Sequence, residues 1–510
     1  MIVVRRALFA ALITATAQLG AAQAPPAHAA PPVKYGVNIH FEQPIVNYVG
    51  TYAPSTYNKV LDLMKAGGSK MVRLPIPWVW IEPNAKGQYD QTYLAKVDAL
   101  LAAANSRGIK SLVTTGGPPC WATSYPNAPC GTAYFSTPGG AYPPRNPADA
   151  GDYAAFVAKR WSGYLSGIEV LNEPNSDQFF QVPPGDDKAL DYTNIVKAEY
   201  AAVKKVKPAM PVVAGSLAFS DTTFLQSMYN DGIAASSDAI SIHPYNVRFD
   251  DPFVKWGDPS VPWPDAPMNS FVLGVPNIHN VMVANGDGAK PLWLTEFGFS
   301  DCNPNYLCMD QTTQSQYMQK SLDLIKTWTY VKVALMHQGY DFSANRETWN
   351  GWGLLRNNYS RRPVYCTFAL AAGVSSCQSD PLSGELNAQQ ALTRAWQLGR
   401  AYYLAHGRSF NGFDANALHA ADSSFTGYVL QAYNVAPSPT ANPKNIGIYV
   451  SSGTNAGTDL EVCNVSTTMA YCVYEHTGNV NHVPAIAHGK ASAGTYAAAG
   501  ATNNGVSTTW

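Results

Sequence analysis

From residue 33 to about residue 374, short apolar runs alternate with amphipathic stretches. The runs have the length and near-continuous apolar character of strands that are buried on both faces, as in a parallel sheet. The stretches between them repeat apolar residues at helical spacing, so the pattern predicts successive βαβ units. The eight predicted strands cover residues 34–40, 70–74, 109–115, 167–172, 210–215, 239–243, 291–296 and 331–337.

Eight strands, each followed by a helix or by a long loop that contains one, match a closed (β/α)8 or TIM barrel. A doubly wound open sheet is the alternative, but it normally has fewer strands and a glycine-rich phosphate loop. No GxGxxG follows the first predicted strand. We therefore predict the α/β class, with a barrel over residues 33–378. The clearest helical patterns cover residues 57–65, 93–104, 152–160, 192–206 and 315–328.

The composition changes after Gln378. One amphipathic helix is predicted over residues 389–406, and four strand-like runs follow it. We predict a small α+β accessory domain over residues 385–484, loosely similar to the head of pilin-like domains, a likeness that carries no function. Residues 485–510 are rich in Ala, Gly, Ser and Thr and are expected to form a partly disordered tail. The four strand-like runs are 428–435, 446–450, 460–465 and 470–474.

The composition excludes two classes of protein. Of 510 residues, 46% are hydrophobic and 14% are charged, which is not the composition of a disordered chain. The 34 basic and 35 acidic residues leave a net charge of −1. A nucleic-acid-binding protein needs a clustered basic excess, so no nucleic-acid partner is expected.

The first 29 residues have the pattern of a secretory signal peptide. Arg5 and Arg6 precede an apolar stretch, residues 7–20, that is too short to span a bilayer. Ala27-His28-Ala29 offers a cleavage site near Ala29. A buried helix or a membrane anchor is the alternative. Since no later apolar run is long enough to span a bilayer, we expect a secreted, extracellular or periplasmic protein without an integral membrane segment.

The chain has eight cysteines, an even number that favours disulfides in an exported protein. Zinc is the competing explanation, but no CxxC or paired-histidine spacing accompanies the cysteines, so no metal is expected. Pairing between sequence neighbours is the simplest of the 105 possible connectivities. It gives Cys120/Cys130, Cys302/Cys308, Cys366/Cys377 and Cys463/Cys472.

Two predicted strands end on a carboxylate. The fourth closes with Asn172-Glu173-Pro174, and the seventh closes with Thr295-Glu296-Phe297-Gly298. In barrels of this kind the chemistry lies at the carboxyl ends of the strands, and strands three apart can face each other across the axis. Glycoside hydrolysis is the chemistry that needs two opposed carboxyl groups, one to protonate the leaving oxygen and one to attack or to activate water.

These motifs resemble those of the clan A glycoside hydrolases, which are retaining (β/α)8 enzymes. The likeness is greatest to glycoside hydrolase family 39 and its bacterial exopolysaccharide-cutting relatives, with family 5 as a near neighbour. The Asn-Glu-Pro triplet is similar to the clan signature on the fourth strand, and the likeness extends over about residues 33–375. The other similar segments are residues 36–40, 118–121, 295–298 and 361–365.

The resemblance implies a role for each matching residue. Glu173 corresponds to the general acid/base and Glu296 to the nucleophile. Arg73 and Tyr245 correspond to the arginine and the tyrosine that support the nucleophile. Asn172 corresponds to the residue that binds the sugar 2-hydroxyl. The physics agrees, because an acid needs a raised pKa and a nucleophile needs cationic and hydrogen-bonding neighbours.

Several other polar residues have more than one interpretation. His243 could orient the substrate or Glu173, or could be a core histidine. Asn38 and His40 end the first strand and could contact the substrate. Glu169 is expected in a polar layer of the barrel. Glu42 and Glu82, in loops, are weak reserve candidates.

Tryptophans gather in or near the predicted rim loops, where a rigid indole can stack on a sugar ring. We expect about half of them to line sugar subsites, Trp121 and Trp349 first, whereas the others simply cover the barrel mouth. They are Trp78, Trp80, Trp121, Trp256, Trp263, Trp349 and Trp352.

The chain also departs from the clan. Many members carry a tryptophan at the end of the eighth strand, where this chain has Met336-His337-Gln338, and a polar residue after the third, where Thr115-Gly116-Gly117 intervenes. The identity of the sugar therefore does not carry over.

The leading hypothesis is a secreted, cofactor-free retaining glycosidase that acts on a polysaccharide or glycoconjugate, at β-linkages. A transglycosylase and a catalytically silent carbohydrate-binding or surface protein are the alternatives. A Ser-His-Asp hydrolase is disfavoured because no GxSxG elbow follows any strand.

Overall fold

A computed structural model gives the fold of the chain. The structure describes residues 32–40, 53–125, 141–248, 255–301, 309–341, 351–381, 384–425, 428–429, 446–450, 459–465, 469–476 and 485–492. The predicted signal segment lies outside these residues, as do Glu42, Cys130, Cys302, Cys308 and Trp349.

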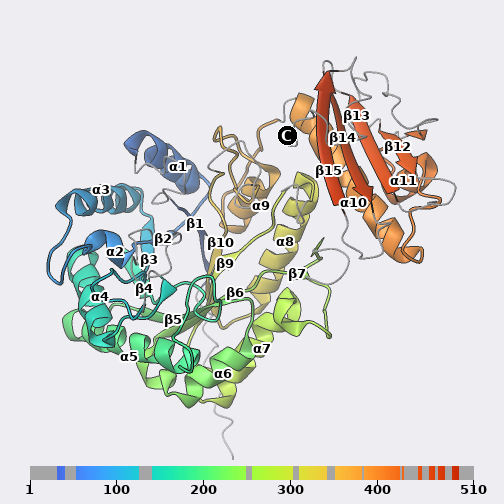
Figure 1. The fold of residues 1–510 in the computed structure, drawn as a ribbon. Helices are drawn as coiled ribbons and strands as arrows, with labels where there is room; N and C mark the ends of the chain where they lie inside the picture. The colour runs from blue at the N-terminus through green and yellow to red at the C-terminus, as the bar shows by residue number, and fades with distance from the viewer. Residues whose placement is uncertain are drawn as a thin grey trace, which may run out of the picture. The chain divides into compact units, whose positions relative to one another are not determined.

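Eight parallel strands close into a barrel in the order β1-β10-β9-β6-β5-β4-β3-β2, and Figure 1 shows helices around it. Each predicted run overlaps one of these strands, so the predicted TIM barrel is confirmed and the open sheet is excluded. The strands β7 (Val247–Arg248) and β8 (Lys255–Trp256) form a separate hairpin after β6. The barrel strands are β1 (Lys34–Asn38), β2 (Met71–Pro75), β3 (Lys110–Thr114), β4 (Leu165–Glu169), β5 (Val212–Ala218), β6 (Ala239–His243), β9 (Leu292–Phe297) and β10 (Val331–Met336).

The helices around the barrel begin at strong start signals. Aspartates at the N-cap of four helices accept backbone N–H bonds and satisfy donors that a helix leaves unpaired: Asp90, Asp187, Asp221 and Asp310. The helices are α1 (Pro54–Ala66), α2 (Trp78–Ile81), α3 (Gln91–Ser106), α4 (Pro147–Trp161), α5 (Lys188–Val206), α6 (Thr222–Asn230), α7 (Phe271–Ala284), α8 (Gln311–Thr327) and α9 (Pro363–Ala371). Short 3-10 helices cover Ile233–Ser236 and Pro267–Asn269.

The barrel interior has an apolar layer followed by a polar layer. Side chains on a strand alternate between its two faces, so residues two apart share the interior. One buried cluster includes Met71, Leu112, Ala239 and Trp293. Two positions further along the same strands stand Arg73, Thr114, Ser241 and Thr295, all buried. The strand period therefore places a polar layer next to the carboxyl ends of the strands.

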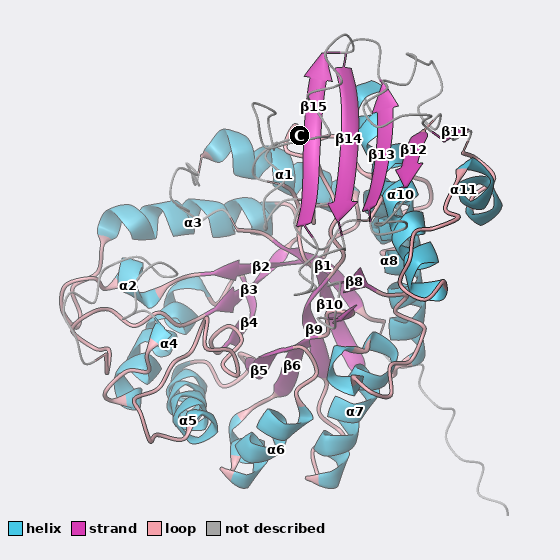
Figure 2. Ribbon diagram, turned by 45° about the vertical axis from the view of Figure 1, so that its right-hand side comes forward, coloured by secondary structure: helices cyan, strands magenta, loops and turns pink. Residues whose placement is uncertain are grey.

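The C-terminal part of the chain contains a five-stranded sheet in the order β11-β12-β13-β14-β15, which Figure 2 shows as neighbouring arrows. The first two strands pair in parallel and the others are antiparallel. The last strand, β15, lies in the stretch that we expected to be a tail. The elements are α10 (Gly384–Ala405), α11 (Ala415–Ala421), β11 (Tyr428–Val429), β12 (Gly447–Val450), β13 (Asp459–Val465), β14 (Met469–His476) and β15 (Ala485–Ser492).

This part has its own apolar cluster, in which α10 packs on the sheet. Leu392 and Trp396 of α10 lie in it with Ile448 and Leu460 of the strands. The disulfide Cys463–Cys472 joins facing positions of β13 and β14, as predicted.

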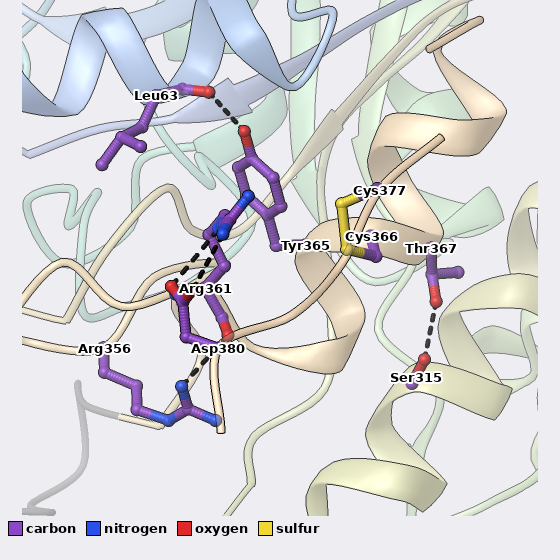
Figure 3. The surroundings of a disulfide bond; sticks show 9 residues. All are labelled: Leu63, Ser315, Arg356, Arg361, Tyr365, Cys366, Thr367, Cys377 and Asp380. Carbon is purple, nitrogen blue, oxygen red and sulfur yellow. Dashed lines mark hydrogen bonds and ion pairs between the residues drawn. A yellow bond between two sulfur atoms is a disulfide. The ribbon is translucent and has the colours of Figure 1, made fainter. Parts of the chain in front are cut away.

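A second predicted disulfide, Cys366–Cys377, links α9 to the segment that follows it (Figure 3). Beside it, Arg361 pairs with Asp380 at 2.8 Å, so two bonds of different kinds fix that segment. Cys120 is also disulfide-bonded. Among the described residues, no helix combines the length and the apolar character needed to cross a membrane.

Candidate active site

Arg73 on β2 is the centre of the polar layer. It is 2% exposed, and its guanidinium donates to groups on several other elements. A planar fork of fixed donors can hold several acceptors in one orientation. Its acceptors are Glu169 Oε2 (2.5 Å), Glu296 Oε1 (2.5 Å), Asn172 Oδ1 (2.8 Å), Asn38 Oδ1 (3.0 Å) and Ser216 Oγ (3.1 Å).

Glu169, at the end of β4, anchors this arginine. Its other contacts are Ser241, which donates to Oε1 at 2.8 Å, and Thr114, which donates to Oε2 at 3.2 Å. The carboxylate is completely buried. The expectation that Glu169 lies in a polar barrel layer is met, and its contact with Arg73 connects it to the site.

Glu296 lies inside β9, and its side chain is 9% exposed. Tyr245 Oη donates to Oε2 at 2.7 Å, while Arg73 donates to Oε1. Burial opposes ionisation, but the charge that His243 carries when it is protonated and the permanent charge of the Arg73 guanidinium outweigh it, so the pKa of Glu296 lies far below the usual range. Glu296 is therefore an ionised carboxylate with fixed donors on both oxygens.

Tyr245 follows β6 and keeps its proton. Burial, and then the negative charge of Glu296, raise the pKa of the Tyr245 hydroxyl well above its ordinary value. The hydroxyl is thus a permanent donor to Glu296.

Glu173 has a different setting, four residues beyond the end of β4. Its backbone is left-handed, with φ at 46°, and its N–H donates to the carbonyl of Ser216 at 2.9 Å. The side chain is 16% exposed, and Nδ1 of His243 lies 2.9 Å from Oε1. His243 is itself completely buried, so its contact with Glu173 is shielded from solvent on the histidine side.

The two carboxyl groups lie close together. Glu173, His243 and Glu296 each bring one oxygen or ring nitrogen to within 4.8 Å of the others. A metal could use such a triad, but the fixed positive charge of Arg73 already pairs with Glu296 and opposes a second cation there. The arrangement is better suited to proton transfer between the carboxyl groups and a bound molecule.

An aromatic wall borders Glu296. His337, directly after β10, contacts Trp352 edge-on at 5.3 Å and His40 at 5.6 Å between ring centroids. Trp352 also contacts Tyr245 at 5.5 Å. Burial lowers the pKa of His337 to about 3 despite the nearby Glu296, so its ring is neutral near pH 7.

The structure thus brings together eight of the ten predicted site residues: Asn38, His40, Arg73, Asn172, Glu173, His243, Tyr245 and Glu296. The described contacts of Trp121 are with other residues: its indole donates to the carbonyl of Glu82 at 2.9 Å, and its ring lies edge-on to Trp78. Glu82 in turn accepts from the indole of Trp78 at 2.7 Å. Trp349 lies outside the described residues.

Sequence reasoning did not single out Ser216, and it noted His337 only as a departure from the clan. Both are polar residues near the carboxyl end of a barrel strand: Ser216 is two residues before the end of β5, and His337 directly follows β10. That position is the signal that could have identified them.

Comparisons with known proteins identify the family and the fold. The family model "Cellulase (glycosyl hydrolase family 5)" matches residues 31–334. No curated protein matches the sequence. The predicted resemblance to clan A, with family 5 as a near neighbour, is therefore confirmed.

Several solved structures share the fold at low sequence identity. A family 39 glycoside hydrolase from Bacteroides cellulosilyticus WH2 is 16% identical, with a TM-score of 0.50 over 88% of this chain and 74% of that one. A monomeric beta-xylosidase from Caulobacter crescentus CB15 is 18% identical, with a TM-score of 0.51 over 67% and 68%. A family 39 enzyme from Xanthomonas axonopodis pv. citri is 16% identical, with a TM-score of 0.51 over 88% and 73%.

Proposed function

The chain belongs to glycosyl hydrolase family 5, and we propose that it cleaves a β-glycosidic bond with retention of configuration. It is a glycoside hydrolase, so its substrate is a carbohydrate. In the proposal, Glu296 is the nucleophile and Glu173 the general acid/base. One observation supports this most: two carboxyl groups within 4.8 Å have opposite settings, one fixed to an arginine and one beside a histidine.

The first step forms a covalent intermediate. A carboxylate oxygen of Glu296 bonds to the anomeric carbon while the bond from that carbon to the leaving oxygen breaks. Glu173 gives its proton to the leaving oxygen, so the leaving sugar departs as a neutral alcohol. Arg73 and Tyr245 hold Glu296 in place through the step, because each already donates to one of its oxygens.

The second step releases the sugar. Water attacks the anomeric carbon, the bond to Glu296 breaks, and Glu173 takes a proton from the water. Retaining enzymes hold their carboxyl groups about 5–5.5 Å apart, whereas inverting enzymes need about 6.5–9.5 Å to admit water between them. The spacing in this chain supports the retaining route.

Asn172 is placed to bind the sugar beside the bond that breaks. Its Oδ1 accepts from Arg73, which leaves its amide nitrogen to donate to a hydroxyl of the sugar. A hydrogen bond to the 2-hydroxyl strengthens as positive charge develops on the ring, so this contact favours the transition state. We further propose a polysaccharide or glycoconjugate substrate and an exported enzyme, since disulfides are typical of exported proteins.

The test is reducing-end release from β-glucans, xylans, mannans and bacterial exopolysaccharides by wild type and by Glu296→Gln. Glu199→Gln is a matched control, because Glu199 is also a buried glutamate but bonds to Thr115 instead of the site. We expect wild type and the control to cleave one substrate and Glu296→Gln to be inactive. Proton NMR of the first product then assigns the anomer, with β expected.

Other outcomes are informative as well. Activity that persists in Glu296→Gln contradicts the nucleophile assignment, and a first product of α configuration contradicts retention. New glycosides formed in the presence of acceptor sugars would make the protein a transglycosylase. Glycan binding without any cleavage would support the alternative hypothesis of a catalytically silent carbohydrate-binding protein.

A further inference from the structure

Ser216, on β5, touches both halves of the site. Its hydroxyl accepts a hydrogen bond from Nη2 of Arg73 at 3.1 Å and lies 3.1 Å from Nε2 of His243. These are the two partners of that hydroxyl within the described part of the chain. The residue is completely buried, so water does not compete for its hydrogen bonds.

The two contacts together determine where the hydroxyl proton goes. Arginine has donors but no acceptor, so Arg73 occupies a lone pair of Ser216 Oγ and leaves the hydroxyl hydrogen for another acceptor. Nε2 of His243 is that acceptor. Since a neutral imidazole carries one proton, that proton then sits on Nδ1.

We propose that Ser216 is a positioning residue that holds His243 in the Nδ1–H tautomer and thereby keeps the acidic proton of Glu173 on Oε2. The proposal rests on the acid/base role proposed above for Glu173. Nδ1–H of His243 donates to Glu173 Oε1 at 2.9 Å, so Oε1 acts as an acceptor. The proton that Glu173 gives to the leaving oxygen must then be on its other oxygen.

The Nε2–H tautomer of His243 would place the proton of Glu173 on the wrong oxygen. With the proton on Nε2, the bare Nδ1 would accept the proton of Glu173 on Oε1, and the acid would point at the histidine instead of the leaving group. The serine hydroxyl disfavours that state, because a proton on Nε2 would leave the hydroxyl hydrogen without its acceptor.

The backbone of Ser216 allows the hydroxyl to be tested alone. Its φ is 50°, in the left-handed region that glycine adopts without strain. Its N–H donates to Ser241 Oγ at 2.7 Å and its carbonyl accepts from Glu173 N–H, and neither bond involves the side chain. Ser216→Gly therefore removes the hydroxyl and relaxes the backbone, while Ser216→Ala removes the hydroxyl and keeps the strain.

The experiment compares both variants with wild type on two aryl β-glycosides of the sugar that wild type cleaves fastest. Phenyl is a poor leaving group that needs protonation, and 2,4-dinitrophenyl is a good one that does not. We expect kcat/KM to fall about 10–100-fold on the phenyl glycoside and less than about 3-fold on the other.

The outcomes separate this inference from the proposed function. Equal losses on both glycosides, or no loss at all, overturn the role of Ser216 while wild type stays active and Glu296→Gln inactive. Failure of the proposed function is recognised differently, by an inactive wild type or an active Glu296→Gln. If Ser216→Ala fails to fold, Ser216→Gly carries the test.

Discussion

The two carboxyl groups of the site are held by different kinds of structure. Glu296 belongs to a barrel strand, and a guanidinium and a phenol donate to its two oxygens. Glu173 lies beyond a strand end on a left-handed backbone, and its described side-chain partner is one imidazole. Their side chains are 9% and 16% exposed.

This difference separates two chemical tasks. A group that must stay ionised gains from rigid donors and a fixed cation, which is what the strand provides. A group that must release and regain a proton needs a neighbour whose own protons can be arranged, and the loop places it against a histidine. The following predictions test whether the two settings correspond to those two tasks.

The largest effect is expected for Glu173→Ala. We predict a loss in kcat/KM of about 10²–10⁴-fold on natural substrates, because leaving-group protonation contributes that much. Activated aryl glycosides need less protonation and are expected to lose far less. Equal losses, measured by steady-state kinetics on both substrate types, would contradict the acid role.

Arg73→Met tests whether the guanidinium stabilises the buried carboxylates of the barrel strands, Glu169 and Glu296. The variant leaves Glu169 and Glu296 buried without their shared cation, and breaking a buried pair costs about 3–5 kcal/mol. Urea unfolding measures this loss. Arg107→Met is the control, because Arg107 pairs with an exposed Asp62 and should cost at most about 1 kcal/mol. A similar loss of unfolding free energy in both variants would mean that the buried charge of Arg73 is not what stabilises Glu169 and Glu296.

Tyr245→Phe removes one donor from Glu296 and keeps the ring. A hydrogen bond to a charged group contributes about 1.5–3 kcal/mol, so we expect kcat to fall about 10–100-fold. Tyr229→Phe is the matched control, since Tyr229 donates to Asp287 away from the site, and its kcat should not change. An unchanged kcat in Tyr245→Phe would show that Arg73 alone supports Glu296.

The last prediction concerns acid stability. The pKa of His337 is about 3 in the folded chain and near 6.5 when unfolded, so the unfolded chain binds more protons between those values. Stability should therefore fall as the pH drops from about 6.5 toward 3, by up to about 1.4 kcal/mol per pH unit for one proton. His337→Phe is expected to flatten this slope in urea unfolding at several pH values. An unchanged slope would assign it to other groups.

The fold and the two carboxylates could be predicted because each leaves a local signal. Apolar runs mark the barrel strands, and the residues after them lie on the catalytic face whatever the exact register. Glu173 and Glu296 stand in motifs of several residues, so each could be recognised without knowing its neighbours.

The features that the sequence did not predict depend on contacts between distant segments. Ser216 carries no motif, and its role comes from lying between Arg73 and His243, which are 143 and 27 positions away in the sequence. The strand β15 was missed because its small residues have weak strand propensity and its pairing with β14 supplies the order. Trp121 was assigned to a sugar subsite from its residue type and its place in a predicted rim loop; its indole N–H bonds to a loop carbonyl, and sugar stacking by its ring stays a prediction.

The left-handed backbone at Glu173 has a consequence for mutational drift. A non-glycine residue in that conformation costs of order 1–3 kcal/mol, which glycine would relieve. Replacement of this glutamate by glycine would relieve that cost, but it would also leave the buried Nδ1 of His243 without its described hydrogen-bond partner and remove the proposed acid. In a population released from the need for activity, the backbone would therefore favour loss of this side chain, and its hydrogen bond with His243 would oppose that loss. Under the proposed function, selection for activity would add to that hydrogen bond in opposing the preference of this backbone for glycine.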